Sequence, residues 1–175
     1  MGLRITGEQV NAIGSHGARE YPNECCGAML GVETGGVKEV RELAALKNIR
    51  QDFARGQELI PLTALETESE RNRFLIDPKD LVQVEKQARN RGLDIIGFYH
   101  SHPDHPARPS AYDRDHAFPW YSYVIITVEA GKPGPYASWV LREDRSQFDE
   151  EEIRIAGQKA PVRVLAGIEE HTGET

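Results

Sequence analysis

One stretch of the chain, Asp94 to His102, most constrains its fold. Its first residues, DIIGFYH, are apolar, aromatic or β-branched, and they follow the turn-like sequence Asn90-Arg91-Gly92. This is the pattern of a largely buried strand. Side chains two residues apart on a strand point to the same face, so His100 and His102 should project together where the strand ends. The fold must therefore place two imidazoles side by side at the end of this strand.

The segment after this strand predicts a loop and then a short helix. Prolines at positions 103, 106 and 109 disfavour both a helix and a central strand, and they predict a stiff loop. Ser110 is a good N-cap residue with an acid three positions later, so a helix should start there with Asp113 on its first turn. Two histidines, one aspartate and a water would complete the tetrahedral set of a catalytic zinc.

Each half of this pattern also has a less specific interpretation. A His-x-His sequence is often two exposed loop histidines, and the spacing from Ser110 to Asp113 is also that of a helix capping box. His105 and His116 lie close by and could contact substrate or a second metal, or could simply be exposed and packed on the helix. Residue type alone leaves these alternatives open.

Taken together, His100-Ser101-His102-Pro103 and Ser110-Ala111-Tyr112-Asp113 resemble the H-x-H-P and S-x-x-D signature of the JAMM (MPN-plus, JAB domain) zinc metallopeptidases. The family signature includes an upstream glutamate, which by this resemblance is Glu24 in the sequence YPNECCG. Composition does not distinguish Glu24 from Glu20 or Glu33. Its assignment therefore depends on the resemblance, which is to the small prokaryotic members of the family.

The resemblance implies both a fold and a site. The fold is expected to be α/β, a three-layer sandwich of a mixed β-sheet with flanking helices, as in MPN and cytidine-deaminase-like proteins. His100, His102 and Asp113 would hold one Zn²⁺ per chain, and a water on that zinc would attack the substrate carbonyl. Glu24 would be the general base and acid. Ser110 would donate a hydrogen bond to the developing oxyanion.

The resemblance also implies a substrate. Small bacterial members of the family are associated with ubiquitin-like sulfur-carrier proteins, and they cleave after the C-terminal Gly-Gly of the carrier. Such a tail would bind extended along a sheet edge. Which carrier is cleaved, and whether the bond is a peptide or an isopeptide, stays open. The alternative is a scaffold or binding module with the same fold, which would not need Glu24 together with the other four residues.

Composition excludes several other classes of function. A formal net charge of −7 argues against nucleic acid or an anionic membrane as a partner, because such surfaces need clustered Lys and Arg. No apolar stretch is long enough to span a membrane, and the first residues lack the apolar core of a secretory signal, so a cytoplasmic protein is expected. The H-x-E pattern of deaminases and the H-E-x-x-H pattern of zincins are both missing.

The adjacent cysteines Cys25 and Cys26 are the only two in the chain. Neighbouring cysteines rarely form a disulfide because the bond would strain the backbone. A second C-x-x-C, which a zinc ribbon would need, is missing. We expect Cys26 to be a small buried core residue.

The rest of the chain predicts one domain over residues 1–155, followed by a C-terminal tail at 156–175. A variable insertion at 48–73 could contain a short helix near 61–72, and it could either border the substrate groove or be a solvated loop. The exposed strand edges of a small sandwich allow a homodimer. Other predicted elements are helices at 6–20 and 78–91, a hairpin of strands 27–31 and 37–46, and strands 122–128, 136–142 and 148–155.

Overall fold

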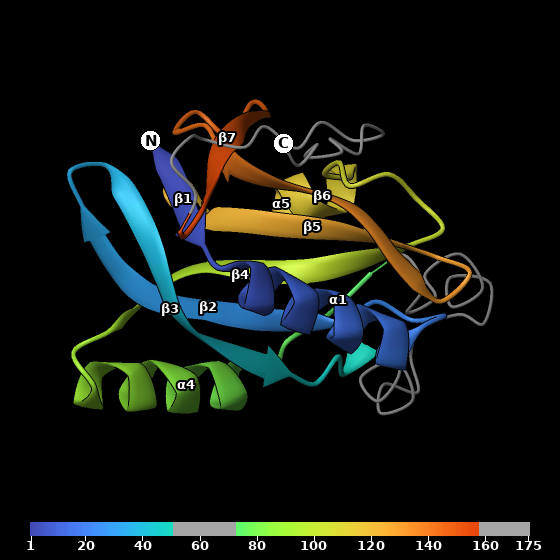
Figure 1. Ribbon diagram of the computed structural model, residues 1–175, viewed down its shortest axis with the longest axis horizontal. Helices are drawn as coiled ribbons and strands as arrows, with labels where there is room; N and C mark the ends of the chain where they lie inside the picture. The colour runs from blue at the N-terminus through green and yellow to red at the C-terminus, as the bar shows by residue number, and fades with distance from the viewer. Residues whose placement is uncertain (51–72, 158–175) are drawn as a thin grey trace, which may run out of the picture.

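The computed structural model describes residues 1–50 and 73–157 (Figure 1). The predicted helix at 61–72, most of the insertion and most of the tail lie outside these ranges. The described elements, in chain order, are β1 (Gly2–Ile5), α1 (Gly7–Glu20), β2 (Cys26–Thr34), β3 (Val37–Leu46), α4 (Pro78–Asn90), β4 (Asp94–Pro103), α5 (Ala111–His116), β5 (Ser122–Glu129), β6 (Lys132–Leu141) and β7 (Phe148–Ile155).

Local signals in the sequence set the starts of the helices. Thr6 caps α1 by accepting a bond from the Gln9 backbone N–H, while the Gln9 side chain accepts one from the Thr6 backbone N–H. Asp77 caps α4, and Pro78 occupies its first turn. Both helices match their predicted ranges to within one residue at each end.

Strand β4 lies in the middle of the strand order and carries the His-x-His sequence. It pairs antiparallel with β2, where Cys26 lies opposite His100, and parallel with β5, where His102 lies opposite Thr127. The strand continues to Pro103, three residues past the apolar run 94–100 that predicts it, because the parallel ladder with β5 extends to the pair Pro103 and Val128. Both imidazoles therefore stand on regular sheet.

The strands close into a barrel, which corrects the predicted three-layer sandwich. The order is β1-β3-β2-β4-β5-β6-β7, and β1 closes the ring by pairing parallel with both β3 and β7. The sequence analysis missed β1, a run of only four residues ahead of α1. The mixed sheet and the flanking helices are confirmed. Closure also pairs the strand edges within the described chain. The exposed edges that suggested a homodimer are therefore not available for pairing there.

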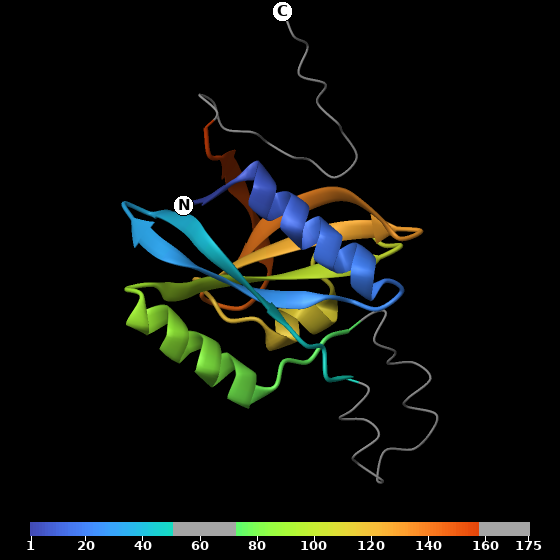
Figure 2. The same ribbon diagram turned by 60° about the horizontal axis from the view of Figure 1, so that its bottom comes forward.

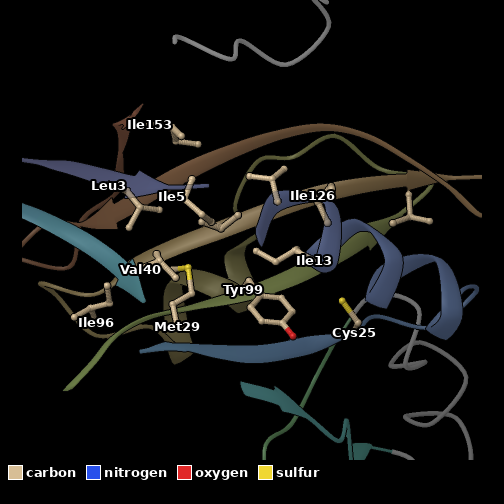
Figure 3. Packing of buried hydrophobic residues seen from close by; sticks show 13 residues of the cluster. Leu3, Ile5, Ile13, Cys25, Met29, Val40, Ile96, Tyr99, Ile126 and Ile153 are labelled. Carbon is tan, nitrogen blue, oxygen red and sulfur yellow. The ribbon is translucent and has the colours of Figure 1, made fainter. Parts of the chain in front are cut away.

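Helices pack on both faces of the sheet, as the predicted sandwich has them, although the strands close into a barrel (Figure 2). Helix α1 contacts β4, β5 and β6 on one face, and α4 contacts β4 from the other, with α5 on the same side as α4. Figure 3 shows the main apolar core between α1 and the strands, where Ile13 lies close to Tyr99 and Ile126. A second core, including Cys26, Val84 and Ala88, lies under α4.

Within residues 1–50 and 73–157, no helix is both long enough and apolar enough to cross a lipid bilayer.

Gly97 is where the ladder between β4 and β5 leaves no room for a side chain. A Cβ at this position would collide with the backbone carbonyl of Ser122 and would lie 2.7 Å from Met29 Cε. We expect Gly97→Ala to lower the free energy of unfolding by about 1–3 kcal/mol, the usual cost of forcing extra atoms into a packed core. Urea denaturation of the metal-free protein measures this change.

The matched control for Gly97→Ala is Gly7→Ala. Gly7 lies at the start of α1, and apart from its own helix and chain neighbours no described heavy atom lies within 4 Å of the position that its Cβ would take. Because alanine favours helix more than glycine does, this control should leave stability unchanged or raise it by up to about 1 kcal/mol. Equal stability of the two variants would contradict the tight packing at Gly97.

Candidate metal centre

Three side chains converge where β4 ends and α5 begins. His100 Nε2 lies 3.1 Å from His102 Nε2 and 3.2 Å from Asp113 Oδ1. His102 Nε2 lies 3.4 Å from Asp113 Oδ2. All three residues are buried, so water does not screen their mutual interactions. The structure thus brings together the three residues that the sequence predicts as metal ligands.

The spacing of these donors fits a tetrahedral zinc ion. Bonds of about 2.0 to 2.1 Å place neighbouring donors of a tetrahedron about 3.3 Å apart, close to the separations found here. His102 Nδ1 lies 2.8 Å from the Pro106 carbonyl oxygen. Because a carbonyl only accepts, this ring nitrogen carries a proton, and in the neutral ring Nε2 then keeps its lone pair. Lone pairs that face one another around a common point are the arrangement that a cation satisfies.

Asp113 is held in place by the start of its own helix. Its Oδ2 accepts hydrogen bonds from the Ser110 backbone N–H at 2.7 Å and from the Ser110 hydroxyl at 2.8 Å. The capping box that the sequence left as an alternative is therefore present, and it orients the carboxylate toward the histidines. Burial would raise the pKa of Asp113, but His100 and His102 outweigh it and hold that pKa well below its ordinary value.

His100 is the most enclosed of the three. Phe74 packs on its ring with centroids 4.8 Å apart, and its Nδ1 has no hydrogen-bond partner among the described residues. Burial lowers the pKa of His100 although Asp113 opposes that change. The ring is therefore kept neutral, which is the form that binds metals.

Glu24 lies beside the three converging donors, just before β2. Its Oε1 is 3.9 Å from His102 Nε2, and its Oε2 is buried without a hydrogen-bond partner in the described chain. Among the described residues, Glu24, His100 and His102 could also form a metal-binding trio, with ligand atoms all within 4.8 Å. We favour Asp113 as the third donor because its oxygens lie closer to both imidazoles. Glu24 stands at about the distance that one water would bridge.

Burial, and next the charge of Asp113, raises the pKa of Glu24 well above its ordinary value. A carboxyl with a raised pKa is a better proton acceptor, and one without a fixed partner can turn toward a water. The surroundings of Glu24 therefore suit acid–base chemistry.

Two residues that the sequence analysis did not single out position Glu24. The Asn48 amide nitrogen donates to the Glu24 and Arg73 carbonyls, and its oxygen accepts from the backbone N–H groups of Arg50 and Leu75. On the other side, the Ser101 hydroxyl accepts from the Cys25 backbone N–H at 2.8 Å. Ser101 separates the two histidines, so its position could have flagged it, whereas most partners of Asn48 lie more than twenty residues away.

Two hollows border the centre. One, of about 390 Å³, is lined by Glu24, His102, His105, Pro106, Arg108 and Ser110. The other, of about 210 Å³, is mostly apolar and reaches His100 and Asp113 from the side of α4 and α5. The hollow lined by polar residues therefore reaches Glu24, His102 and Ser110, and the apolar hollow reaches His100 and Asp113.

The remaining candidates from the sequence have plainer surroundings. His116 is exposed, stacks on the Tyr112 ring at 4.0 Å and bonds the Tyr112 carbonyl, so it packs on α5. His105 is exposed at the rim of the polar hollow. Cys25 and Cys26 are free and buried, and burial raises the pKa of the Cys25 thiol to about 11. The expectation of a buried Cys26 is confirmed.

Comparison with known proteins points to one family. The family model described as prokaryotic homologs of the JAB domain matches residues 8–142. A desampylase of Haloferax volcanii is 39% identical over 57 residues, which cover 32% of this chain and 41% of that protein. A probable TtuB-protein conjugate cleaving protease of Thermus thermophilus is 32% identical over 115 residues, or 66% of this chain and 63% of that one. The chain thus spans about half the length of the curated relatives it matches.

Solved structures agree over more of the chain. A solution structure of a Desulfitobacterium hafniense protein is 30% identical, with a TM-score of 0.69, and covers 89% of this chain and 94% of its own. A Salinibacter ruber protein is 35% identical, with a TM-score of 0.63, and covers 93% and 95%. The architecture is therefore shared across nearly the whole length of both chains.

Proposed function

The chain belongs to the prokaryotic homologs of the JAB domain, and on that premise we propose that it is a zinc-dependent peptidase or isopeptidase. Its substrate would be a ubiquitin-like sulfur-carrier protein, cleaved after the C-terminal Gly-Gly. The observation that carries this proposal is the convergence of His100, His102 and Asp113, with Glu24 and Ser110 beside them.

His100, His102 and Asp113 are the residues that would hold the zinc. When bound, the ion lowers the pKa of a water to about 7 and polarises the carbonyl that is attacked. The chain's own contribution is to fix the donors in advance. The Pro106 carbonyl and the Ser110 hydroxyl and N–H each orient one of these donors.

Glu24 would move the proton. Its carboxylate takes a proton from the attacking water and returns it to the departing amine, so the same side chain serves as base and then as acid. The buried setting that raises its pKa favours the first of these steps.

Ser110 would steady the negative charge that develops on the carbonyl oxygen. A hydroxyl has a single proton to donate, and in the structure the Ser110 hydroxyl points it at Asp113 Oδ2. To assist the reaction the hydroxyl must turn toward the substrate. Asp113 would still be held by the Ser110 backbone N–H.

The names of the relatives support a protein conjugate as substrate. They are a desampylase and a probable TtuB-protein conjugate cleaving protease. A flexible tail that ends in Gly-Gly suits a centre enclosed by buried side chains, because glycines pass where larger residues would clash. The polar hollow beside Glu24 and Ser110 would admit this tail.

The alternative is a scaffold or binding module that keeps the fold but catalyses nothing. Such a protein would have no use for two buried imidazoles, an oriented carboxylate and a buried glutamate so close together. Burying ionisable groups costs stability unless they are fully paired, so a function is the reason to keep them. The arrangement therefore favours an enzyme.

We predict that the zinc-loaded protein shortens a cognate carrier that bears a C-terminal extension. Intact mass spectrometry should record a product ending at Gly-Gly, and a carrier with Ala-Ala at that position should stay intact. A preparation stripped of zinc is the second control. Unchanged mass across several cognate carriers, with zinc present, would overturn the substrate proposal.

A further inference from the structure

The loop between β4 and α5 is fastened by three side chains at three consecutive carbonyls. Thr127 Oγ1 donates to the His105 carbonyl at 2.9 Å, and His102 Nδ1 donates to the Pro106 carbonyl at 2.8 Å. Trp139 Nε1 donates to the Ala107 carbonyl at 3.0 Å. Thr127 stands on β5 and Trp139 on β6, the two strands that follow β4 in the barrel (Figure 1).

The middle one of these carbonyls decides which nitrogen of His102 is free. A neutral imidazole has one N–H and one lone pair, and it can carry the proton on either nitrogen. The Pro106 carbonyl can only accept, so it fixes the proton on Nδ1 and leaves the lone pair on Nε2. That nitrogen faces His100 and Asp113. If the Pro106 carbonyl shifted, the proton of His102 would no longer be confined to Nδ1.

Backbone contacts alone give the Pro106 carbonyl little support. Pro106 has no N–H of its own, and the carbonyl's other bond comes from Arg108, two residues away in the same loop. Thr127 and Trp139 hold the carbonyls on either side from the rigid barrel. The peptide planes on either side of the one that carries the Pro106 carbonyl are therefore anchored from outside the loop.

We propose that Thr127 and Trp139 are positioning residues that raise the affinity of the centre for zinc by fixing the Pro106 carbonyl, and through it the His102 tautomer. This inference rests on the proposed zinc site. Neither side chain is among the three converging donors, and each acts through one backbone carbonyl. Partners of this kind are worth about tenfold to a hundredfold in metal affinity.

Two substitutions remove these bonds with little change of shape. Thr127→Val loses the hydroxyl and stays β-branched, and Trp139→Phe loses the indole N–H but keeps an aromatic ring. We expect each to raise the zinc dissociation constant about tenfold, and the double variant to raise it about a hundredfold. Competition with a chromophoric chelator measures the constants.

Trp120→Phe is the matched control. Its indole N–H also donates a bond, to Glu33 Oε2 at 3.0 Å, but Trp120 lies near the start of β5, the opposite end from Thr127. Zinc affinity of this variant should equal that of the wild type.

A second readout follows the tautomer directly. In metal-free wild type, the ¹⁵N shifts of the His102 ring should report a proton on Nδ1, and in the double variant they should report a mixture. A lower melting temperature with unchanged zinc affinity and an unchanged His102 tautomer would overturn the inference, because the bonds would then serve stability alone. The single variants decide the matter if the double variant does not fold. A wild type that fails to bind zinc would instead overturn the proposed function, and the His102 tautomer would still test the positioning.

Discussion

Replacing Glu24 by glutamine is expected to lower kcat for carrier cleavage by about a hundredfold to ten-thousandfold, the range that a positioned acid–base group contributes. Glutamine keeps the size of the side chain but cannot take a proton from water. The Glu24 carboxylate is 3.9 Å from His102 Nε2, close enough to share a water with the centre. Single-turnover kinetics with zinc content measured on the same sample would test this expectation.

Glu20→Gln is the matched control for this variant. It makes the same chemical change four residues earlier, at an exposed carboxylate whose Oε1 lies 4.0 Å from His16 Nε2. Its activity should match that of the wild type. A Glu24→Gln variant that keeps full zinc and most of its activity would show that another group carries the proton.

Stability separates lost chemistry from a damaged fold. Burial, and next Asp113, raises the pKa of Glu24, so the folded state holds this proton more tightly than the unfolded chain does. The stability that the Glu24 proton contributes is fully present at a pH below the pKa of Glu24 in the unfolded chain. It is lost as the pH rises through the pKa of Glu24 in the folded state. Glutamine does not titrate, so the metal-free Glu24→Gln variant does not lose this stability at neutral pH. Calorimetry should give it a melting temperature no lower than that of the wild type.

The parts of the fold that the sequence predicted are those set by local signals. The capping residue Thr6, the Asp77-Pro78 start of α4 and the apolar run of β4 each act within a few residues of where they stand. The His-x-His pair follows in the same way from the two-residue repeat of a strand. Position on a regular element was therefore enough to place two of the three proposed ligands.

The parts that were missed depend on contacts between distant residues. Strand β1 is too short to stand out, and it exists because β3 and β7 supply partners on both sides. Lys38 lies in a strand rich in charged residues, yet it is buried and donates to the Trp120 carbonyl and the Ser122 hydroxyl. Asn48 likewise bonds backbone groups on either side of the 51–72 segment, at Arg50 before it and at Leu75 after it. No local pattern contains these partners.

The second large expected effect is the loss of zinc when one of its proposed ligands is removed. His102→Ala should lower the metal content from about one zinc per chain to near none, because a tetrahedral site with three protein ligands loses one of them. Elemental analysis after removal of loosely held metal would measure this. His105→Ala is the matched control, since His105 lines the same hollow, is exposed and takes no part in the convergence of donors. It should retain its zinc.

Unfolding experiments give the same site an independent test. Zinc binds the folded chain, so free zinc at a hundred times its dissociation constant should stabilise the wild type by about 2.7 kcal/mol. A chelator should reverse that gain in the wild type and in His105→Ala. It should leave His102→Ala unchanged, because that variant has no bound zinc to lose. If His102→Ala kept both its zinc and the stabilisation, the metal would have to lie on other side chains, and the convergence of His100, His102 and Asp113 would need another explanation.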